Sequence, residues 1–256
     1  MFKRAGLALG FTLIEMAIVL VVIGLVVGGG VAAVGPALQN SRIAESSQKL
    51  DRIEQALILH VIRYGCLPCP ATPGTASTGT AAGQAVAAGT PYTSGCQVGV
   101  CTNTQGVVPW INLAISESDA TDGFGTRISY AIATSGLLQQ TNGMTRTLPS
   151  SYPVGDLVVN NASAVEVTGG AGNRAAYVLI SHGPNRAYGF LAQVGGTAIT
   201  DPFSSVPELA NSDGTPFVQD DFNANQGVAY FDDLVRWRGA ALIIQLCGMN
   251  ACGNPA

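Results

Sequence analysis

Two hydrophobic patterns follow one another in the first quarter of the chain, and both are typical of a helix. Between Met16 and Leu38 no side chain is charged, and residues 17–27 are almost all Ile, Leu, Val and Ala. About 20 apolar residues are enough for a helix to cross a bilayer. From Gln39 onward the pattern becomes amphipathic. Its apolar positions fall at helical spacing: Ile43, Leu50, Ile53, Leu57 and Val61.

These two patterns predict one long helix from Phe11 to Tyr64, whose second half docks its apolar stripe on a globular head. Gly28–Gly30, Gly35 and Pro36 interrupt the helix-favouring residues. Each glycine weakens a helix by about 1 kcal/mol and a proline by about 3 kcal/mol. We therefore expect a kink at this segment, or local melting once the chain is packed among partners. Close packing of helices at the glycines is the alternative interpretation.

The helix is expected to end at Gly65, which suits a C-terminal cap, because Pro68 and Pro70 follow it. Residues 71–95 contain mainly Ala, Thr, Gly and Ser and indicate a long loop. Beyond this loop, short runs bracketed by Gly, Asn, Asp and Pro indicate an antiparallel sheet packed on the helix, an α+β fold. The expected strands are residues 106–110, 127–133, 156–159, 175–181, 187–193 and 234–246, the last one broken by Gly239.

A short charged segment precedes the apolar run. It carries Lys3 and Arg4 and no acid, a bias that keeps this end in the cytoplasm and directs the rest of the chain outward. Glu15 stands immediately before the apolar run, within Gly10-Phe11-Thr12-Leu13-Ile14-Glu15. A carboxylate deep in a membrane helix costs on the order of 2.5 to 3.5 kcal/mol, so such a residue normally has a partner.

This segment resembles the class III leader of type IV pilins and type II secretion pseudopilins. The resemblance implies that a prepilin peptidase cuts between Gly10 and Phe11 and methylates the new N-terminus at Phe11. It also implies that Glu15 pairs with the terminal amine of a neighbouring subunit, which fixes the axial register. An ordinary secretory signal cleaved near Val31-Ala32-Ala33, or an uncleaved anchor, are the alternatives.

The resemblance implies a pilin-like organisation and a location. The chain would be a single-pass inner-membrane protein with its head in the periplasm, and would later enter a filament or reach the cell surface. Its partners would be the prepilin peptidase, other pilin or pseudopilin subunits and an inner-membrane assembly platform. The implied segments are a leader (1–10), a transmembrane and filament-core helix (11–38), an amphipathic helix half (39–64) and a globular α+β head (65–256).

Four stretches of the head are similar to one group of large pilin-like proteins. They are Leu67–Pro70, Gly106–Trp110, Asp122–Gly125, and Ser181–Asn185 together with Asp232–Val235. The length is large for a subunit repeated thousands of times, which favours a minor pilin or pseudopilin, a structural subunit without enzymatic activity. The alternative is a filament-displayed head that binds a surface, an exported substrate or DNA.

Six cysteines lie beyond the apolar run, an even number that in an exported domain predicts three disulfides. We expect a local bond between Cys247 and Cys252. The remaining bonds, Cys66 to Cys96 and Cys69 to Cys101, would tie the helix end to the sheet across the 71–95 loop. A zinc site made by Cys66, Cys69, Cys96 and Cys101 is the alternative. A redox Cys-x-x-Cys lacks the usual strand-to-helix context.

The composition argues for a folded protein and against a nucleic-acid partner. Of 256 residues, 47% are hydrophobic and 11% charged, well below the roughly 25% charged residues of typical domains. Twelve basic residues against 16 acidic ones provide no field to attract phosphates. A local patch with Arg174 and Arg186 is the one arrangement that would change this conclusion.

The sequence gives little sign of catalysis. Only two histidines occur, and His60 lies among apolar helix residues, where it is expected to pack or face solvent. His182 adjoins Ser181, but neighbouring side chains on a strand point to opposite faces. We therefore expect Ser181–Asn185 to form a tight turn, with no nucleophile, base and orienting group assembled.

Acidic residues in the C-terminal part supply oxygen ligands of the kind that calcium prefers. They are Asp213, Asp220, Asp221, Asp232 and Asp233. Some pseudopilins hold calcium in a C-terminal loop, so the resemblance leaves a calcium site open. The spacing is not that of an EF-hand, and solvated acidic loops are the simpler interpretation, with no cofactor.

Overall fold

A computed structural model describes residues 11–96, 100–140, 143–144, 154–192, 196–214, 216–247 and 252–253. The expected leader and its last residue, Gly10, lie outside these residues. The described chain divides into two compact units, one ending at Ser41 and one beginning at Arg42.

Helix α1 (Leu13–Tyr64) belongs to both units. Thr12 precedes it, and its hydroxyl accepts a hydrogen bond from the backbone N–H of Glu15 at 3.3 Å. Helix α1 continues through Gly28–Gly30, Gly35 and Pro36, although an interior proline removes one hydrogen bond and crowds the carbonyl four residues before it. The kink expected at this segment, and local melting once the chain is packed among partners, stay predictions. Of the helices in the described part of the chain, none meets the length and apolarity needed for a membrane crossing.

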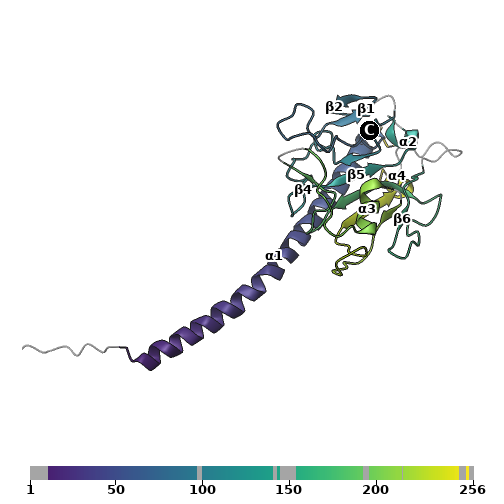
Figure 1. The fold of residues 1–256 in the computed structure, drawn as a ribbon. Coiled ribbons are helices and arrows are strands. Elements are labelled where there is room, and N and C mark those ends of the chain that lie inside the picture. The colour runs from purple at the N-terminus through teal and green to yellow at the C-terminus, as the bar shows by residue number, and fades with distance from the viewer. Residues whose placement is uncertain are drawn as a thin grey trace, which may run out of the picture. The chain divides into compact units, whose positions relative to one another are not determined.

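A four-stranded antiparallel sheet forms the centre of the second unit, in the order β10-β7-β5-β3 (Figure 1). Two further antiparallel pairs, β1–β2 and β4–β8, lie beside it, and β6–β9 is parallel. The strands are β1 (Ala85–Ala87), β2 (Thr90–Tyr92), β3 (Gln105–Val107), β4 (Thr126–Arg127), β5 (Ser129–Ile132), β6 (Val159–Asn160), β7 (Ala175–Ser181), β8 (Phe190–Leu191), β9 (Phe217–Val218) and β10 (Leu234–Gly239). The remaining helices are α2 (Gly136–Gln139), α3 (Val206–Asp213) and α4 (Ala240–Leu246).

Four of the five residues of the predicted apolar stripe of α1 form one side of the main core; the first, Ile43, is only partly buried. Leu50, Ile53, Leu57 and Val61 are fully buried, in the same cluster as residues of β5 and β7. Glu54 on this helix accepts a hydrogen bond from the hydroxyl of Tyr177 at 3.2 Å. The head is thus a mixed α/β structure built on the second half of α1.

Helix α1 ends where the sequence predicts, with Gly65 as its C-terminal cap. Gly65 has a φ of +70°, a left-handed conformation that glycine adopts without steric cost. Its N–H donates to the carbonyl of Val61 at 2.7 Å, which satisfies one of the last free carbonyls of the helix.

Three expectations for the head need correction. Residues 240–246 form α4 and not the second half of a strand, because an apolar run of this length fits either element and tertiary packing decides. The 71–95 segment contains the hairpin β1–β2, whose alternate residues are buried although they are small. Helix α3 was not expected, although Ser205, Pro207 and Glu208 are a typical helix start: the Ser205 hydroxyl accepts from the backbone N–H of Glu208.

The head contains three disulfides, and they are the three pairs that the sequence led us to expect. Cys66–Cys96 and Cys69–Cys101 have Cα separations of 6.2 and 5.3 Å, and Cys247–Cys252 has one of 5.4 Å. The alternative of a zinc site made by the first four cysteines is therefore wrong, because their sulfur atoms are consumed in two covalent bonds.

His60 is a packing residue in the last turns of α1. It is 4% exposed, and its Nδ1 donates to the carbonyl of Cys66 at 3.0 Å, which fixes the neutral tautomer. Burial lowers its pKa below the usual 6.5. A lowered pKa means that the unfolded chain binds the proton more tightly than the folded chain, so the folded state loses stability as the pH falls below about 6.5.

We therefore predict that His60 makes the stability of the folded state depend on pH, and that His60→Asn removes this contribution. The asparagine amide can still donate to the Cys66 carbonyl but does not titrate. The difference in free energy of unfolding, wild type minus variant, is expected to be constant above about pH 7. Below about pH 6.5 it is expected to decline, because the wild type loses stability there and the variant does not lose this contribution. Urea denaturation between pH 4 and 8 measures it; parallel curves for the two proteins would contradict the prediction.

Candidate functional site

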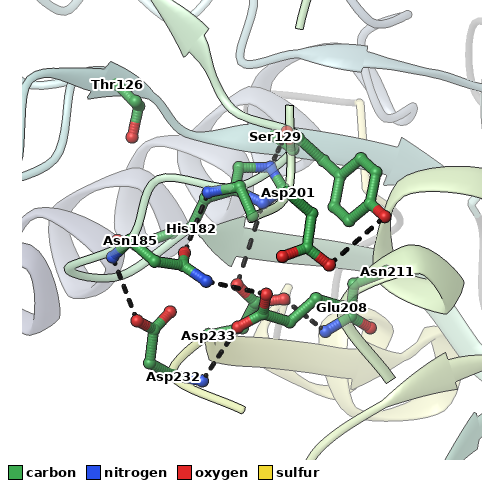
Figure 2. A network of polar contacts seen from close by, with 12 residues as sticks. Thr126, Ser129, His182, Asn185, Asp201, Glu208, Asn211, Asp232 and Asp233 are labelled. Carbon is green, nitrogen blue, oxygen red and sulfur yellow. Dashed lines mark hydrogen bonds and ion pairs between the residues drawn. The ribbon is translucent and has the colours of Figure 1, made fainter. Parts of the chain in front are cut away.

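A group of buried acidic side chains lies where the end of β7, the first turn of α3 and the start of β10 meet (Figure 2). Because Leu234 pairs with Ser181 in the antiparallel register, the next residues outward, Asp233 and His182, are neighbours across the two strands. Glu208 reaches the same place from α3. One carboxylate oxygen from each of Glu208, Asp232 and Asp233 lies within 4.8 Å of the others, and all three residues are buried.

Neutral groups hold these carboxylates in position. Asp232 accepts from the hydroxyl of Tyr230 at 2.6 Å and from the backbone N–H of Asn185 at 3.0 Å, both on Oδ2. Glu208 accepts from the Asn185 side-chain amide at 2.8 Å, and Asp233 Oδ2 accepts from the Asn211 amide at 2.7 Å. These donors carry no charge, so the hydrogen bonds orient the acids without neutralising them.

His182 lies against the acidic group and is 1% exposed. Its Nε2 and the Ser129 hydroxyl on β5 are 2.7 Å apart and hydrogen-bonded. Its Nδ1 is 3.8 Å from Asp233 Oδ1, too far for a hydrogen bond, and neither atom has another partner among the described residues.

The glycine that follows His182 is required by the turn. Gly183 has a φ of +53°, and a Cβ at this position would collide with the backbone oxygen and Oδ1 of Asp232. The turn expected at Ser181–Asn185 is present from Gly183 to Asn185, whereas Ser181 is the last residue of β7. Glycine allows this turn to close over the acidic group.

Burial changes the proton affinity of every member of the group. It raises the pKa of Glu208 to about 7 and that of Asp232 above its usual value, and the proximity of the two carboxylates adds to the effect on Glu208. Burial raises the pKa of Asp233 well above the usual value and lowers the pKa of His182 to about 4. All four side chains are thus pushed toward their uncharged forms, as expected where burial is the largest effect and no described residue supplies a compensating charge.

The structure corrects our interpretation of the histidine's surroundings. A serine, a histidine and an aspartate do meet, but the serine is Ser129, 53 residues before His182. Ser181 instead donates to Asp122 at 2.8 Å. Asp233 makes no hydrogen bond to His182, so the Asp–His contact of a catalytic triad is not formed.

The candidate calcium ligands separate into two sets. Asp232 and Asp233 belong to the buried group. Asp213, Asp220 and Asp221 are exposed, and Asp220 accepts from the backbone N–H of Ala162 at 2.7 Å. Glu208 was missed, although the capping pattern Ser205-x-x-Glu208 would have placed it at a helix start. Carboxylates that converge without a counter-charge fit a divalent cation, and the residues that would hold it are Glu208, Asp232 and Asp233.

The other expected site residues lie in the first unit. Phe11 is 78% exposed, and Glu15 lies in the first turn of α1. The Glu15 carboxylate has no hydrogen bond or ion pair in the described part of the chain. Comparisons with protein-family models, curated proteins and solved structures found no match to this chain.

Proposed function

We propose that this protein is a structural subunit of a filament of the type IV pilus or type II secretion kind. In this proposal a prepilin peptidase cleaves between Gly10 and Phe11, and the first half of α1 holds the chain in the inner membrane. The same helix later packs among the helices of neighbouring pilin or pseudopilin subunits. The large head favours a minor subunit, with no enzymatic role.

The observation that carries the proposal is an apolar helix surface that no described residue covers. Every described side chain from Phe11 to Val26 is exposed, including Leu13 at 92% and Leu25 at 72%. A continuous apolar surface of this kind on a soluble monomer is unfavourable and indicates a membrane or protein partner. The unpaired carboxylate of Glu15 at the start of this surface supports the pairing with a terminal amine that the leader resemblance implies.

The test is replacement of Glu15 by alanine in cells that carry the assembly machinery. If Glu15 compensates the amine of a neighbour, its loss leaves a buried charge unpaired, which costs on the order of 3 kcal/mol. We expect at least a tenfold decrease of the chain in sheared filaments at equal membrane levels, measured by immunoblot. Glu45→Ala is the matched control, because Glu45 is an exposed acid on the same helix whose ion-pair partner among the described residues is Lys49.

Mass spectrometry of the membrane-bound chain tests the processing step separately. The expected first residue is Phe11, with one methyl group on its nitrogen. A chain that begins at Met1, or after residue 27, would refute the proposal, as would Glu15→Ala filaments at the wild-type level.

A further inference from the structure

Three of the six buried side-chain polar atoms that have no hydrogen-bond partner among the described residues lie together at the acidic group. They are His182 Nδ1, Asp232 Oδ1 and Asp233 Oδ1; the other three, His60 Nε2, Asn112 Nδ2 and Arg238 Nε, lie apart from it. A buried polar group left unpaired costs about 1 to 3 kcal/mol, so native structures contain few of them. Three such atoms on neighbouring side chains indicate that these side chains have a partner that is not among the described residues.

The way these side chains are held is typical of metal ligands. His182, Asp232 and Asp233 each have one polar atom fixed by a hydrogen bond and a second one free (Figure 2). Residues that bind metals usually have this division, because outer hydrogen bonds orient the atom that faces the ion. The Ser129 hydroxyl does this for His182: it can accept from Nε2–H, which leaves the lone pair of Nδ1 free to bind a cation.

His182 contacts the acidic group through Asp233. The 3.8 Å between His182 Nδ1 and Asp233 Oδ1 is too long for a hydrogen bond. In a tetrahedral zinc site with bonds of roughly 2.0 to 2.2 Å, two ligand atoms stand about 3.4 Å apart, so a small approach would let both atoms bind one ion. Glu208 and Asp232 each have a carboxylate oxygen within 4.8 Å of one of Asp233; His182 is not a member of that group, so these two carboxylates have to move toward the imidazole to bind the same ion.

We propose that His182 and Asp233, together with the carboxylates of Asp232 and Glu208, form a binding site for one first-row transition-metal ion, zinc being the ion expected. The imidazole nitrogen distinguishes this site from a calcium or magnesium site, because those ions prefer oxygen ligands alone. The site is also distinct from a calcium loop made by Asp213, Asp220 and Asp221, which lie elsewhere. The bound ion would join the end of β7 to α3 and β10 in the place of a covalent cross-link.

The experiment uses the full chain, purified in mild detergent, treated with a chelator and dialysed. Zinc is then titrated calorimetrically, and thermal unfolding is followed with zinc, manganese, calcium or magnesium. We expect one zinc ion per chain and a rise in melting temperature of roughly 5 °C or more at a hundredfold excess over Kd. All six cysteines are in disulfides, so no thiol competes for the metal.

Variants separate metal binding from a purely structural role. Asp233→Asn preserves shape and removes one buried charge, so the metal-free variant is expected to melt no lower than the wild type and to lose the response to zinc. His182→Gln is expected to weaken zinc binding at least tenfold. His60→Asn removes the other imidazole and Asp221→Asn removes an exposed acid; both are expected to retain the zinc response.

Three results would overturn the proposal. The first is the absence of saturable zinc binding to the wild-type chain, and the second is an equal rise in melting temperature of Asp233→Asn with zinc. The third is a calcium response equal to that of zinc and unaffected by His182→Gln, because the imidazole would then not be a ligand. None of these results bears on filament assembly, which is measured in cells through Glu15.

Discussion

Replacing Arg127 by methionine is expected to lower the free energy of unfolding of the head by about 3 to 5 kcal/mol, the usual cost of breaking a buried charged network. Arg127 has no exposed surface, although it carries a full charge. Its guanidinium forms an ion pair with Glu117 at 2.8 Å and lies 5.0 Å from the ring centre of Trp110.

The Arg127 side chain also donates hydrogen bonds to backbone carbonyls of loops that are distant from it in sequence. It donates to the backbone carbonyls of Pro73 at 3.0 Å, Thr75 at 2.5 Å and Ala192 at 2.8 Å. Methionine fills a similar volume but donates nothing, so these partly buried carbonyls lose a fully buried donor. The loss of donors, and not of packing, therefore dominates the expected effect.

Arg52→Met is the matched control for this prediction. Arg52 also forms an ion pair at 2.8 Å, with Asp119, but its side chain is 62% exposed. An exposed pair contributes at most about 1 kcal/mol, because water screens it and solvates each partner after separation. Urea unfolding followed by circular dichroism compares the two variants. Similar losses for both would show that the Arg127 network contributes no more than a surface pair.

The parts of the fold that the sequence predicts are those with a local signal. The stripe of Leu50, Ile53, Leu57 and Val61 has helical spacing over several turns, and all four residues are in the core. Strand β7, an apolar run between turn residues, has the predicted bounds Ala175–Ser181. By contrast, residues 240–246 are apolar at nearly every position, so no period distinguishes the helix that they form from a strand.

The candidate site depends on contacts that no local pattern contains. Asp233 meets His182 because β10 pairs with β7 in one register, and a shift by one residue would point Asp233 to the opposite face. Glu208 joins them from a helix whose docking position is set by tertiary packing. The acidic residues could be recognised as oxygen donors from the sequence, but not sorted into buried and exposed ones.

Removing both disulfides at the end of α1 is expected to have the largest effect of all. The bonds Cys66–Cys96 and Cys69–Cys101 overlap, since each closes a loop of about the same residues, with separations of 30 and 32. A first bond across about 30 residues stabilises by about 3.7 kcal/mol in the chain-entropy account. Once it is formed, the second closes a ring of only about ten residues and adds about 2.6 kcal/mol.

The free-energy costs of removing the two bonds are therefore predicted not to add: removing both should cost more than the sum of removing each alone. Replacing either pair by alanine should cost about 2.6 kcal/mol, because the other pair still closes the loop, whereas replacing all four cysteines should cost about 6 kcal/mol. Cys247→Ala with Cys252→Ala is the control, a separate loop of separation 5 whose cost of about 2 kcal/mol should add to the others.

Urea unfolding of the four proteins completes the thermodynamic cycle, and pulse proteolysis gives the folded fraction where the four-cysteine variant is mostly unfolded. Equal costs for the first and second removal would mean that the two loops act independently. The chain-entropy account would then fail here, and the stabilisation would have to come from contacts that the sulfur atoms make in the core, where Cys66, Cys69 and Cys101 are buried.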